Sequence, residues 1–560
     1  MSFLKINNLS VDYQMRKETV YAAKNINIEV NKGEILGLVG ESGSGKSTVG
    51  NAIINLIDEP GKVSGGSVIL GDLNIHKNSE SIVNYRGNKI GLIFQDPQTS
   101  LNPILTIGEQ LIETIQTHLQ ISKEEAKIKS INLLKEVGIK DAEKRFDNYP
   151  HQFSGGMRQR VVISLALCCE PELLIADEPT TALDVSIQSQ ILELIKMLTK
   201  ERNLAVILIT HDMGVIAETT DRVAVMKSGD LVEIGITKEI LTNPQKNYTK
   251  SLVSSVPPTN KKISRFVIIE NENKDNKHNN IKILNRWQKR KIKSHDLVKV
   301  KNLSKSFDDN FFTENSKNSV MAVNDVSFKI TEGETFGLVG ESGSGKSTIA
   351  KMIVNLFKPT SGDIFFDEVC ITKIKQNSEL MKFRKQIQMI FQDPYSSLNG
   401  RLKVKDIIAE PIKLHNPTIS NSDLNSYIFD LLESVELIQK SADRYPHEFS
   451  GGQRQRISIA RALATQPRLL VCDEPTSALD VSIQAQILNL LKDLQEQLNL
   501  TILFISHDLP VVRQMCDRIG VLKDGKLCEV TDTEDLFLRP QHEYTKELLR
   551  LMPKIESIYN

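Results

Sequence analysis

A stretch of twelve residues occurs twice in the chain without a single difference. Residues 37–48 and residues 337–348 both read Gly-Leu-Val-Gly-Glu-Ser-Gly-Ser-Gly-Lys-Ser-Thr. Each copy follows a short apolar run and contains Gly-x-x-x-x-Gly-Lys-Ser, the pattern of a phosphate-binding loop between a buried strand and a helix. There, backbone N–H groups and the positive end of the helix point at one anion. A chance Gly/Ser turn does not explain two identical copies, so we expect two nucleotide sites.

Further landmarks repeat at a nearly constant distance of about 300 residues. The pairs are Lys46 and Lys346, Gln95 and Gln392, Ser154 and Ser450, Glu178 and Glu474, and His211 and His507. A period this long indicates a duplicated domain, because solenoid repeats span roughly 20 to 50 residues. We therefore expect a first ATPase domain with a C-terminal tail over residues 1–259, a linker over 260–294, and a second such domain over 295–560.

Each half has the same order of apolar patterns. Two β-rich segments open it, at residues 4–13 and 24–30 in the first half and 298–307 and 323–330 in the second. A helical stretch follows the glutamine (107–137; 407–438), and strand and helix patterns then alternate. This order predicts an α/β fold in each half, with an N-terminal antiparallel β subdomain, a parallel α/β core and a helical insert. The polar residues 308–319 read as an enlarged loop.

Composition excludes some classes of partner. The 70 acidic and 70 basic residues cancel, so no global field demands nucleic acid or an anionic membrane. The six cysteines have no metal-ligand spacing, and we expect free core thiols. The N-terminus does not resemble a signal peptide and no apolar run reaches the roughly 18 residues of a membrane span. We expect a soluble chain whose membrane contact is indirect.

The segment between the halves differs in composition from both. Residues 260–294 are rich in Lys and Asn and end in a basic cluster, residues 286–291. A basic cluster can touch lipid headgroups or nucleic acid, but a solvated linker is the commoner meaning of such a segment. We expect a solvated linker here and no nucleic-acid partner.

An acid pair closes one apolar run in each half. Asp177 and Glu178 follow Leu-Leu-Ile-Ala, and Asp473 and Glu474 follow Leu-Leu-Val-Cys. Carboxyl ends of strands are where α/β sheets bind ligands. We expect the aspartates to hold Mg2+ and the glutamates to orient and deprotonate the attacking water, a role worth roughly 10^2 to 10^4 in rate. The alternative is an acid pair that only caps the following turn.

Gln95 and Gln392 follow a strand just before the helical insert, so each is placed to report the nucleotide to that insert. His211 and His507 follow apolar strands, and we expect a neutral imidazole that donates to a phosphate oxygen or to the water. A structural histidine is the alternative.

Another anion site precedes a helix in each half, at Phe-Ser-Gly-Gly. The phosphate loop alone supplies the helix start that binds the ATP of its own half. The second helix start is therefore expected to bind the ATP of the neighbouring half. We therefore expect a head-to-tail pseudo-dimer in which Lys46 and Ser450 hold one ATP while Lys346 and Ser154 hold the other. Asp184 and Asp480, in Ala-Leu-Asp turns after the acid pairs, would lie at the shared interface.

Taken together, these motifs resemble those of tandem ATP-binding-cassette (ABC) proteins over nearly the whole of both halves. The resemblance implies ATP and Mg2+ as cofactors, Glu178, Glu474, His211 and His507 as catalytic residues, and an adenine-stacking role for Tyr13 and Phe307. The expected nucleotide-binding positions are Tyr13, Gly40, Gly43, Gly45, Lys46, Ser47, Thr48, Gln95, Ser154, Gly155, Gly156, Asp184, Phe307, Gly340, Gly343, Gly345, Lys346, Ser347, Thr348, Gln392, Ser450, Gly451, Gly452 and Asp480. The expected metal-binding positions are Ser47, Gln95, Asp177, Ser347, Gln392 and Asp473.

Two pairs of segments resemble those of dipeptide, oligopeptide and nickel importers. They are the glutamine segments at residues 94–103 and 391–399, which both begin with Phe-Gln-Asp-Pro, and the tails at 243–252 and 539–548. This resemblance implies an ATPase that energises import through two membrane permease subunits, fed by a substrate-binding protein, from the cytoplasmic face of the inner membrane. The transported solute is not readable from the chain.

The second half keeps two residues that the first half lacks. Met157 stands where the second half has Gln453, and Leu165 where it has Arg461. Both changes fall at the ATP site expected between Lys346 and Ser154, which we expect to turn over more slowly. Two other functions stay open at this stage: a tandem ATPase acting on ribosomes or nucleic acid, and a nucleotide-sensing scaffold without catalysis. The importer-type segments favour transport over the first, and the presence of both glutamates disfavours the second.

Overall fold

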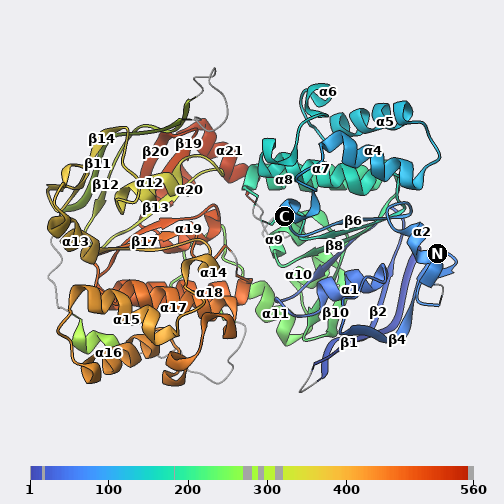
Figure 1. Cartoon of the computed structure of the whole chain (residues 1–560). Coiled ribbons are helices and arrows are strands. Elements are labelled where there is room, and N and C mark those ends of the chain that lie inside the picture. The colour runs from blue at the N-terminus through green and yellow to red at the C-terminus, as the bar shows by residue number, and fades with distance from the viewer. Residues whose placement is uncertain are drawn as a thin grey trace. The chain divides into compact units, whose positions relative to one another are not determined.

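The computed structural model describes residues 2–15, 19–77, 79–181, 183–268, 281–287, 295–308, 319–477 and 479–552. They form two compact units, within Met1–Val256 and Pro257–Met552. Figure 1 shows both units and labels many of their helices and strands.

The first unit contains two sheets. Its small sheet is antiparallel, with the order β2-β1-β4-β5. Its large sheet has the order β10-β9-β3-β8-β7-β6, and every neighbouring pair in it is parallel except β10 with β9. The strands are β1 (Leu4–Gln14), β2 (Thr19–Val30), β3 (Ile35–Val39), β4 (Gly61–Leu70), β5 (Leu73–Asn74), β6 (Ile90–Ile93), β7 (Leu173–Asp177), β8 (Ala205–Thr210), β9 (Arg222–Lys227) and β10 (Asp230–Ile236).

Helices of the first unit follow the strands in the order that the sequence predicts. They are α1 (Lys46–Ile53), α2 (Ser79–Tyr85), α3 (Pro97–Ser100), α4 (Ile107–His118), α5 (Lys123–Glu136), α6 (Ala142–Arg145), η1 (Pro150–Gln152), α7 (Gly155–Leu167), α8 (Val185–Glu201), α9 (Met213–Thr219), α10 (Thr237–Thr242) and α11 (Asn247–Ser254). The helical insert is two helices and not one, because Ser122 and Glu125 form a capping box that starts α5.

The second unit repeats this architecture, with sheets in the order β12-β11-β14-β15 and β16-β17-β18-β13-β19-β20. Its strands are β11 (Asp296–Asp308), β12 (Ser319–Thr331), β13 (Thr335–Val339), β14 (Ser361–Phe366), β15 (Val369–Cys370), β16 (Ile387–Ile390), β17 (Leu469–Asp473), β18 (Thr501–Ile505), β19 (Arg518–Lys523) and β20 (Lys526–Asp532). Its helices are η2 (Lys282–Arg286), α12 (Lys346–Ile353), η3 (Ile371–Lys373), α13 (Asn377–Gln386), α14 (Pro394–Ser397), α15 (Val404–His415), α16 (Asn421–Ser434), η4 (Gln439–Asp443), η5 (Pro446–Glu448), α17 (Gly451–Leu463), α18 (Val481–Leu498), α19 (Leu509–Met515), α20 (Thr533–Leu538) and α21 (Glu543–Leu551).

The predicted fold class is therefore confirmed in both units, with one refinement. The core sheet is mixed, since the hairpin strands β10 and β20 run antiparallel at one edge. The central strands β3, β13, β17 and β18 are buried along their whole length. Helices such as α7 and α8 pack on one face of the large sheet in the first unit, and the small sheet packs on the other face together with α1; the second unit repeats this packing. The loop expected over residues 308–319 falls, except for its two ends, outside the described residues.

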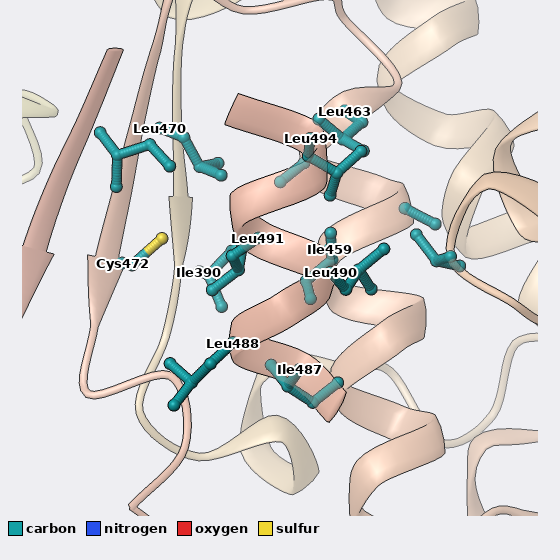
Figure 2. Close-up of a cluster of buried hydrophobic side chains, with 14 of the residues drawn as sticks. Ile390, Ile459, Leu463, Leu470, Cys472, Ile487, Leu488, Leu490, Leu491 and Leu494 are labelled. Atoms are coloured by element: carbon teal, nitrogen blue, oxygen red, sulfur yellow. The ribbon is translucent and has the colours of Figure 1, made fainter. Parts of the chain in front are cut away.

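A continuous apolar core joins helices α17 and α18 to the large sheet of the second unit. Figure 2 shows Ile459 and Leu463 of α17 beside Leu490 and Leu494 of α18. On the other side of α18, its leucines face Ile390, Leu470 and Cys472 of β16 and β17. The helix that begins at the Phe-Ser-Gly-Gly motif and the helix that begins at the Ala-Leu-Asp turn thus share one core.

The expectation of a solvated linker is wrong for the described residues of this segment. Residues 257–268 and 281–287, which we call the strap, belong to the second unit and pack on its helices. Phe266, Ile281, Ile283 and Trp287 are buried in its core. The Lys- and Asn-rich composition hid these apolar anchors, which are spaced too irregularly for a helix or a strand.

Hydrogen bonds tie the strap to α18 and α19. The amide of Asn489 accepts from the backbone N–H of Phe266 and donates to its carbonyl, both at 2.9 Å. Gln514 donates to the carbonyl oxygens of Pro258 and Lys261 at 3.0 and 2.9 Å. Lys492 donates to the carbonyls of residues 263 and 264, and burial lowers its pKa to about 8. The strap is thus part of the second unit's folded structure.

Within the part of the chain that the structure describes, none of the helices combines the length and the hydropathy of a membrane span.

Docking of the strap predicts a specific loss of stability. We expect Ile283→Ala to destabilise the docked strap by about 2 to 4 kcal/mol, because it removes a fully buried side chain. The neighbouring Leu284, which is 42% exposed, is the matched control, and Leu284→Ala should change the stability of the docked strap by less than about 0.5 kcal/mol. The single tryptophan, Trp287, lies in the strap, so urea titration of its fluorescence measures docking directly. Equal effects of the two substitutions would contradict a docked strap.

Candidate nucleotide sites

Both phosphate loops have the strand-loop-helix geometry that the motif predicts. β3 leads into the loop before α1, and β13 leads into the loop before α12. Gly45 and Gly345 precede these helices with φ of 99° and 104°. A Cβ on Gly45 would lie 2.0 Å from the carbonyl oxygen of Ala22, so only glycine fits. Ser47 and Thr48, with Ser347 and Thr348, lie in the first turn of the two helices, where unpaired N–H groups favour an anion.

The loop lysines are held more firmly than a mobile charge. The Lys46 ammonium donates to the carbonyls of Gly40 and Glu41 at 2.8 and 2.9 Å, and Lys346 makes the same contacts at 2.8 and 2.7 Å. Both side chains are buried. In this structure the loop carbonyls therefore hold each ammonium beside the N–H groups of its own loop.

Each aspartate of the acid pairs meets the serine of its own phosphate loop. The Ser347 hydroxyl donates to Asp473 at 2.9 Å, and Ser47 lies near enough to Asp177 to oppose the rise in its pKa. Burial raises the pKa of both aspartates, and the neighbouring glutamate adds to that rise. The Oδ1 atom of Asp177 is shielded from solvent with no partner among the described residues. A hydroxyl beside a buried carboxylate is a set of oxygen donors that suits Mg2+.

Each glutamate of the acid pairs is the centre of a hydrogen-bonded cluster. Glu178 Oε1 lies 2.9 Å from His211 Nδ1, and Glu178 Oε2 accepts from Gln95 at 3.0 Å. Glu474 lies 3.2 Å from His507 Nδ1 and accepts from Gln392 at 2.7 Å. The structure thus brings together three residue types that the sequence places far apart, and it does so in both units.

Electrostatics within this cluster favour an ion pair. Burial alone would raise the pKa of Glu178, but the hydrogen bond and charge of His211 outweigh it and lower that pKa to about 2. Burial would lower the pKa of His211, but its contacts with Glu178 raise it above the ordinary value. The pKa of Glu474 is lowered and that of His507 raised by the same balance. The contact with the carboxylate thus shifts each histidine towards its protonated form, while the role expected of a neutral imidazole stays a prediction.

Backbone strain marks the same glutamates. Glu178 and Glu474 both have φ of 47°, in the left-handed region that costs a residue other than glycine free energy. Their N–H groups donate to the carbonyls of Ile209 and Ile505 at 2.8 and 2.9 Å. The neighbouring strands β8 and β18 therefore hold the glutamates at the carboxyl edge of the sheet.

The Phe-Ser-Gly-Gly serines cap their helices as expected, but the two caps differ. Ser154 accepts from the N–H of Met157, and Ser450 from that of Gln453, both at 3.4 Å. Gln453 also reaches back to accept from the N–H of Ser450 at 3.2 Å, which completes a capping box. A methionine side chain cannot make this bond in the first unit.

Arg461 makes a second contact that the first unit lacks. Its guanidinium donates to the carbonyl of Ser397 at 2.6 Å and so ties α17 to α14, just after the Gln392 segment. Leu165, its counterpart on α7, packs against the apolar core instead. The signature helix and the glutamine segment are therefore joined by a polar contact in the second unit that Leu165 cannot form in the first.

The remaining expected residues have local roles that are visible within each unit. Asp184 and Asp480 cap α8 and α18 by accepting from the N–H groups three residues on, at 3.0 Å in both. Gly156 and Gly452 let Ile187 and Ile483 approach closely, since a Cβ would lie 2.6 and 2.3 Å from these side chains. Tyr13 is half-buried, whereas Phe307 is 39% exposed and meets Phe357 edge to face. The exposed ring of Phe307 is thus accessible to solvent, whereas Tyr13 is partly covered.

Two tyrosines of the tails were missed as site residues. Tyr248 of α11 and Tyr544 of α21 accept hydrogen bonds from the N–H groups of Glu41 and Glu341, at 3.4 and 3.2 Å. Both N–H groups belong to the phosphate loops. The only sequence signal was the repeated Tyr-Thr in the tail motif, which carried no indication of a partner 200 residues away.

The cysteines carry no metal site in the parts of the chain that the structure describes. No group of three or more His, Cys, Asp or Glu residues is arranged to hold a metal there. Cys168, Cys169, Cys472 and Cys516 are buried, whereas Cys370 and Cys528 are half-buried. The last two therefore differ from the expected core thiols.

Comparison with known proteins decides the family. The family model described as "ABC transporter" matches residues 23–181 and 323–477, and the model "Oligopeptide/dipeptide transporter, C-terminal region" matches residues 232–282 and 528–559. The chain belongs to the ABC transporter family. The predicted tandem of two ATP-binding cassettes and the predicted ATPase class are thereby confirmed.

Full-length relatives agree with this assignment. The glutathione import ATP-binding protein GsiA of Escherichia coli (strain K12) is 42% identical over 570 residues, covering 99% of this chain and 90% of the relative. The protein of the same name from Pectobacterium atrosepticum is 41% identical, covering 98% and 89%. Among solved structures, the ATP-binding cassette MJ0796 bound to ADP and Pi is 33% identical, covering 42% of this chain and 98% of that one, with a TM-score of 0.38.

Proposed function

We propose that the chain hydrolyses ATP to energise import of a peptide or a related small solute through partner membrane permeases. The observation that carries the importer role is the match of both tails to the C-terminal region of oligopeptide/dipeptide transporters. Relatives named for glutathione import make glutathione, itself a small peptide, the first solute to test. The chain works with two permease subunits and a substrate-binding protein, and it lies at the cytoplasmic face of the inner membrane.

Two ATPs bind head to tail, each between the phosphate loop of one cassette and the signature of the other. Lys46 and Ser450 hold one ATP, while Lys346 and Ser154 hold the other. The support is that each unit has two helix starts suited to an anion, of which its own phosphate loop accounts for one. Tyr13 and Phe307 stack on adenine, and Gly43, Gly343, Gly155 and Gly451 expose backbone near the phosphates.

Ser47 with Asp177, and Ser347 with Asp473, hold Mg2+ in the two sites. When bound, the ion neutralises charge on the phosphate oxygens during phosphoryl transfer. Gln95 and Gln392 donate their amide N–H to the glutamates, which leaves each amide oxygen to face the metal or the attacking water. The same glutamines lead into the helical inserts and thereby couple the nucleotide to the permeases.

Glu178 and Glu474 act as bases once their present hydrogen bonds rearrange. A carboxylate whose pKa is lowered to about 2 by a hydrogen-bonded histidine is a poor base. When His211 turns to a phosphate oxygen, Glu178 loses the ion pair that lowers its pKa and becomes more basic. The cluster therefore couples arrival of the γ-phosphate to activation of the base.

An importer requires that the chain reach membranes through permeases and that uptake depend on both glutamates. We expect the chain to sediment with membranes only in cells that also express its partner permeases, and uptake of labelled glutathione or tripeptides to require the chain. The Glu178→Gln/Glu474→Gln variant should still reach the membranes but lose uptake. Sedimentation with ribosomes, or uptake that survives in this variant, would contradict the proposal.

Unequal surroundings predict unequal ATP turnover. Glu178→Gln disables the site completed by Gln453 and Arg461, whereas Glu474→Gln disables the site completed by Met157 and Leu165. Since base removal costs roughly 10^2 to 10^4 in rate at each site, each variant reports the turnover that its other site supports. In the full complex we expect Glu178→Gln to lose more steady-state ATPase activity than Glu474→Gln, and Met157→Gln with Leu165→Arg to narrow the difference. Equal losses in the two glutamate variants would refute the asymmetry.

A further inference from the structure

The second half of the strap occupies a groove on the second unit. In Figure 1 it is the light-green turn beside α16. Its backbone is bonded at three points: the N–H of Ile283 donates to Ser434 Oγ at 3.0 Å, and that of Ile281 to Gln497 Oε1 at 3.4 Å. Gln466 Nε2 donates to the carbonyl of Arg286 at 3.0 Å. The groove is thus formed by α16 and the residues at the ends of α17 and α18.

Side chains add an apolar and a charged component to this contact. Ile281, Ile283 and Trp287 are only 4, 0 and 7% exposed. Arg286 pairs with Asp430 at 2.6 Å and donates to Ser426 Oγ at 2.6 Å. The occupant is therefore a short 3-10 helical segment, η2 with the residues beside it, that carries three large apolar side chains and a basic one.

The first unit has a groove at the equivalent place. It has a volume of about 370 Å³ and is lined by residues of α5 and by residues at the ends of α7 and α8. Helices α5 and α16 have the same length, 14 residues, so their positions align one to one. Among the described residues, no segment of the chain corresponds to the strap in this groove. Ile128 in its lining is 62% exposed.

The positions that form hydrogen bonds with the strap backbone in the second unit can form the same kinds of hydrogen bond in the first unit. Ser434 and Gln497, which accept from backbone N–H groups, align with Glu136 and Glu201. Carboxylates accept such bonds at least as well as a hydroxyl or an amide. The donor Gln466 aligns with Glu170, but Lys129 lies 2.7 Å from Glu170 and supplies a donor there.

Charge distinguishes the two grooves. Glu125, Glu136 and Glu170 line the groove of the first unit against Lys129 and Arg202, so negative charge is in excess. Arg202 pairs with Glu136, and Lys129 with Glu170. Such partly exposed pairs contribute at most about 1 kcal/mol each, so an incoming cation can replace them. The groove therefore favours an occupant with a net positive charge.

We propose that this groove binds a short segment of a partner polypeptide that folds as η2 does and has the apolar spacing of Ile281, Ile283 and Trp287 and a net positive charge. The segment lies as the strap does in the other unit, with its N–H groups on Glu136 and Glu201 and its apolar side chains against Ile128 and Leu133. The strap gives the second cassette an in-chain occupant, whereas the first cassette recruits its occupant from another protein of the complex.

A peptide with the sequence of residues 279–289 carries this apolar spacing and three basic side chains and serves as the probe. We expect the fluorescein-labelled peptide to bind the full chain saturably by fluorescence anisotropy. Replacing its Lys282, Arg286 and Lys289 by glutamate should weaken binding by about tenfold or more, a change of about 1.4 kcal/mol. Equal binding of the two peptides would overturn the charge assignment.

Variants of the full chain locate the binding. Ile128→Glu and Glu170→Lys change exposed or partly exposed lining residues, and each should weaken binding about tenfold. Glu124→Lys is the matched control, because Glu124 is exposed on α5 outside the lining, and it should leave affinity within about twofold. Absence of saturable binding, or binding that the two lining variants leave unchanged, would refute the site.

Two other occupants are distinguished by the same titration. If truncation after Met552 raises peptide affinity by tenfold or more, the chain's own C-terminal residues fill the groove and the proposal fails. If the chain dimerises in sedimentation velocity and Ile128→Glu abolishes the dimer, a second copy is the occupant and the proposal fails. A monomer whose peptide affinity is unchanged by the truncation supports a partner polypeptide.

Discussion

The register of three parallel strands determines where everything else in each cassette lies. In the first unit β8 pairs Thr210 with Val39 of β3 and Ile209 with Asp177 of β7. The phosphate loop, the acid pair and the histidine therefore begin at the same edge of the sheet, within reach of one ligand. Because a slip of register would move each strand end relative to its neighbours, the buried apolar side chains that hold the strands together also hold the site together.

Much of this arrangement is predictable from the sequence, because the relevant signals are local. The phosphate loops, the acid pairs and the serine caps each depend on a few consecutive residues, and the pattern of strands around them sets the topology. The sequence predicts only that Gln95, Glu178 and His211 act on the same nucleotide. The hydrogen bonds that join the three side chains are visible only in the structure. The hydrogen bond that raises the pKa of His211 comes from a carboxylate 33 residues away, which no local pattern reveals.

Long-range contacts account for what the sequence did not predict. Tyr248 and Tyr544 reach the phosphate loops across about 200 residues, and their tail motif alone names no partner. The strap looked solvated because Lys and Asn dominate its composition, whereas Phe266, Ile283 and Trp287 determine its packing. The average composition of a segment reflects its many exposed residues, whereas a few buried apolar side chains determine whether the segment docks.

Identical phosphate loops thus lie in cassettes that differ around them: one signature helix has Gln453 and Arg461, and the other has Met157 and Leu165. The central claim is that each loop is completed by the signature of the opposite half. It is tested most directly by counting the ATP retained by the hydrolysis-deficient Glu178→Gln/Glu474→Gln chain. Adding Lys46→Ala with Ser450→Ala should leave one of the two ATPs bound, because both changes affect the same site, whereas Lys46→Ala with Ser154→Ala should leave neither. The reverse outcome would contradict the account, since it would mean that each cassette completes its own site.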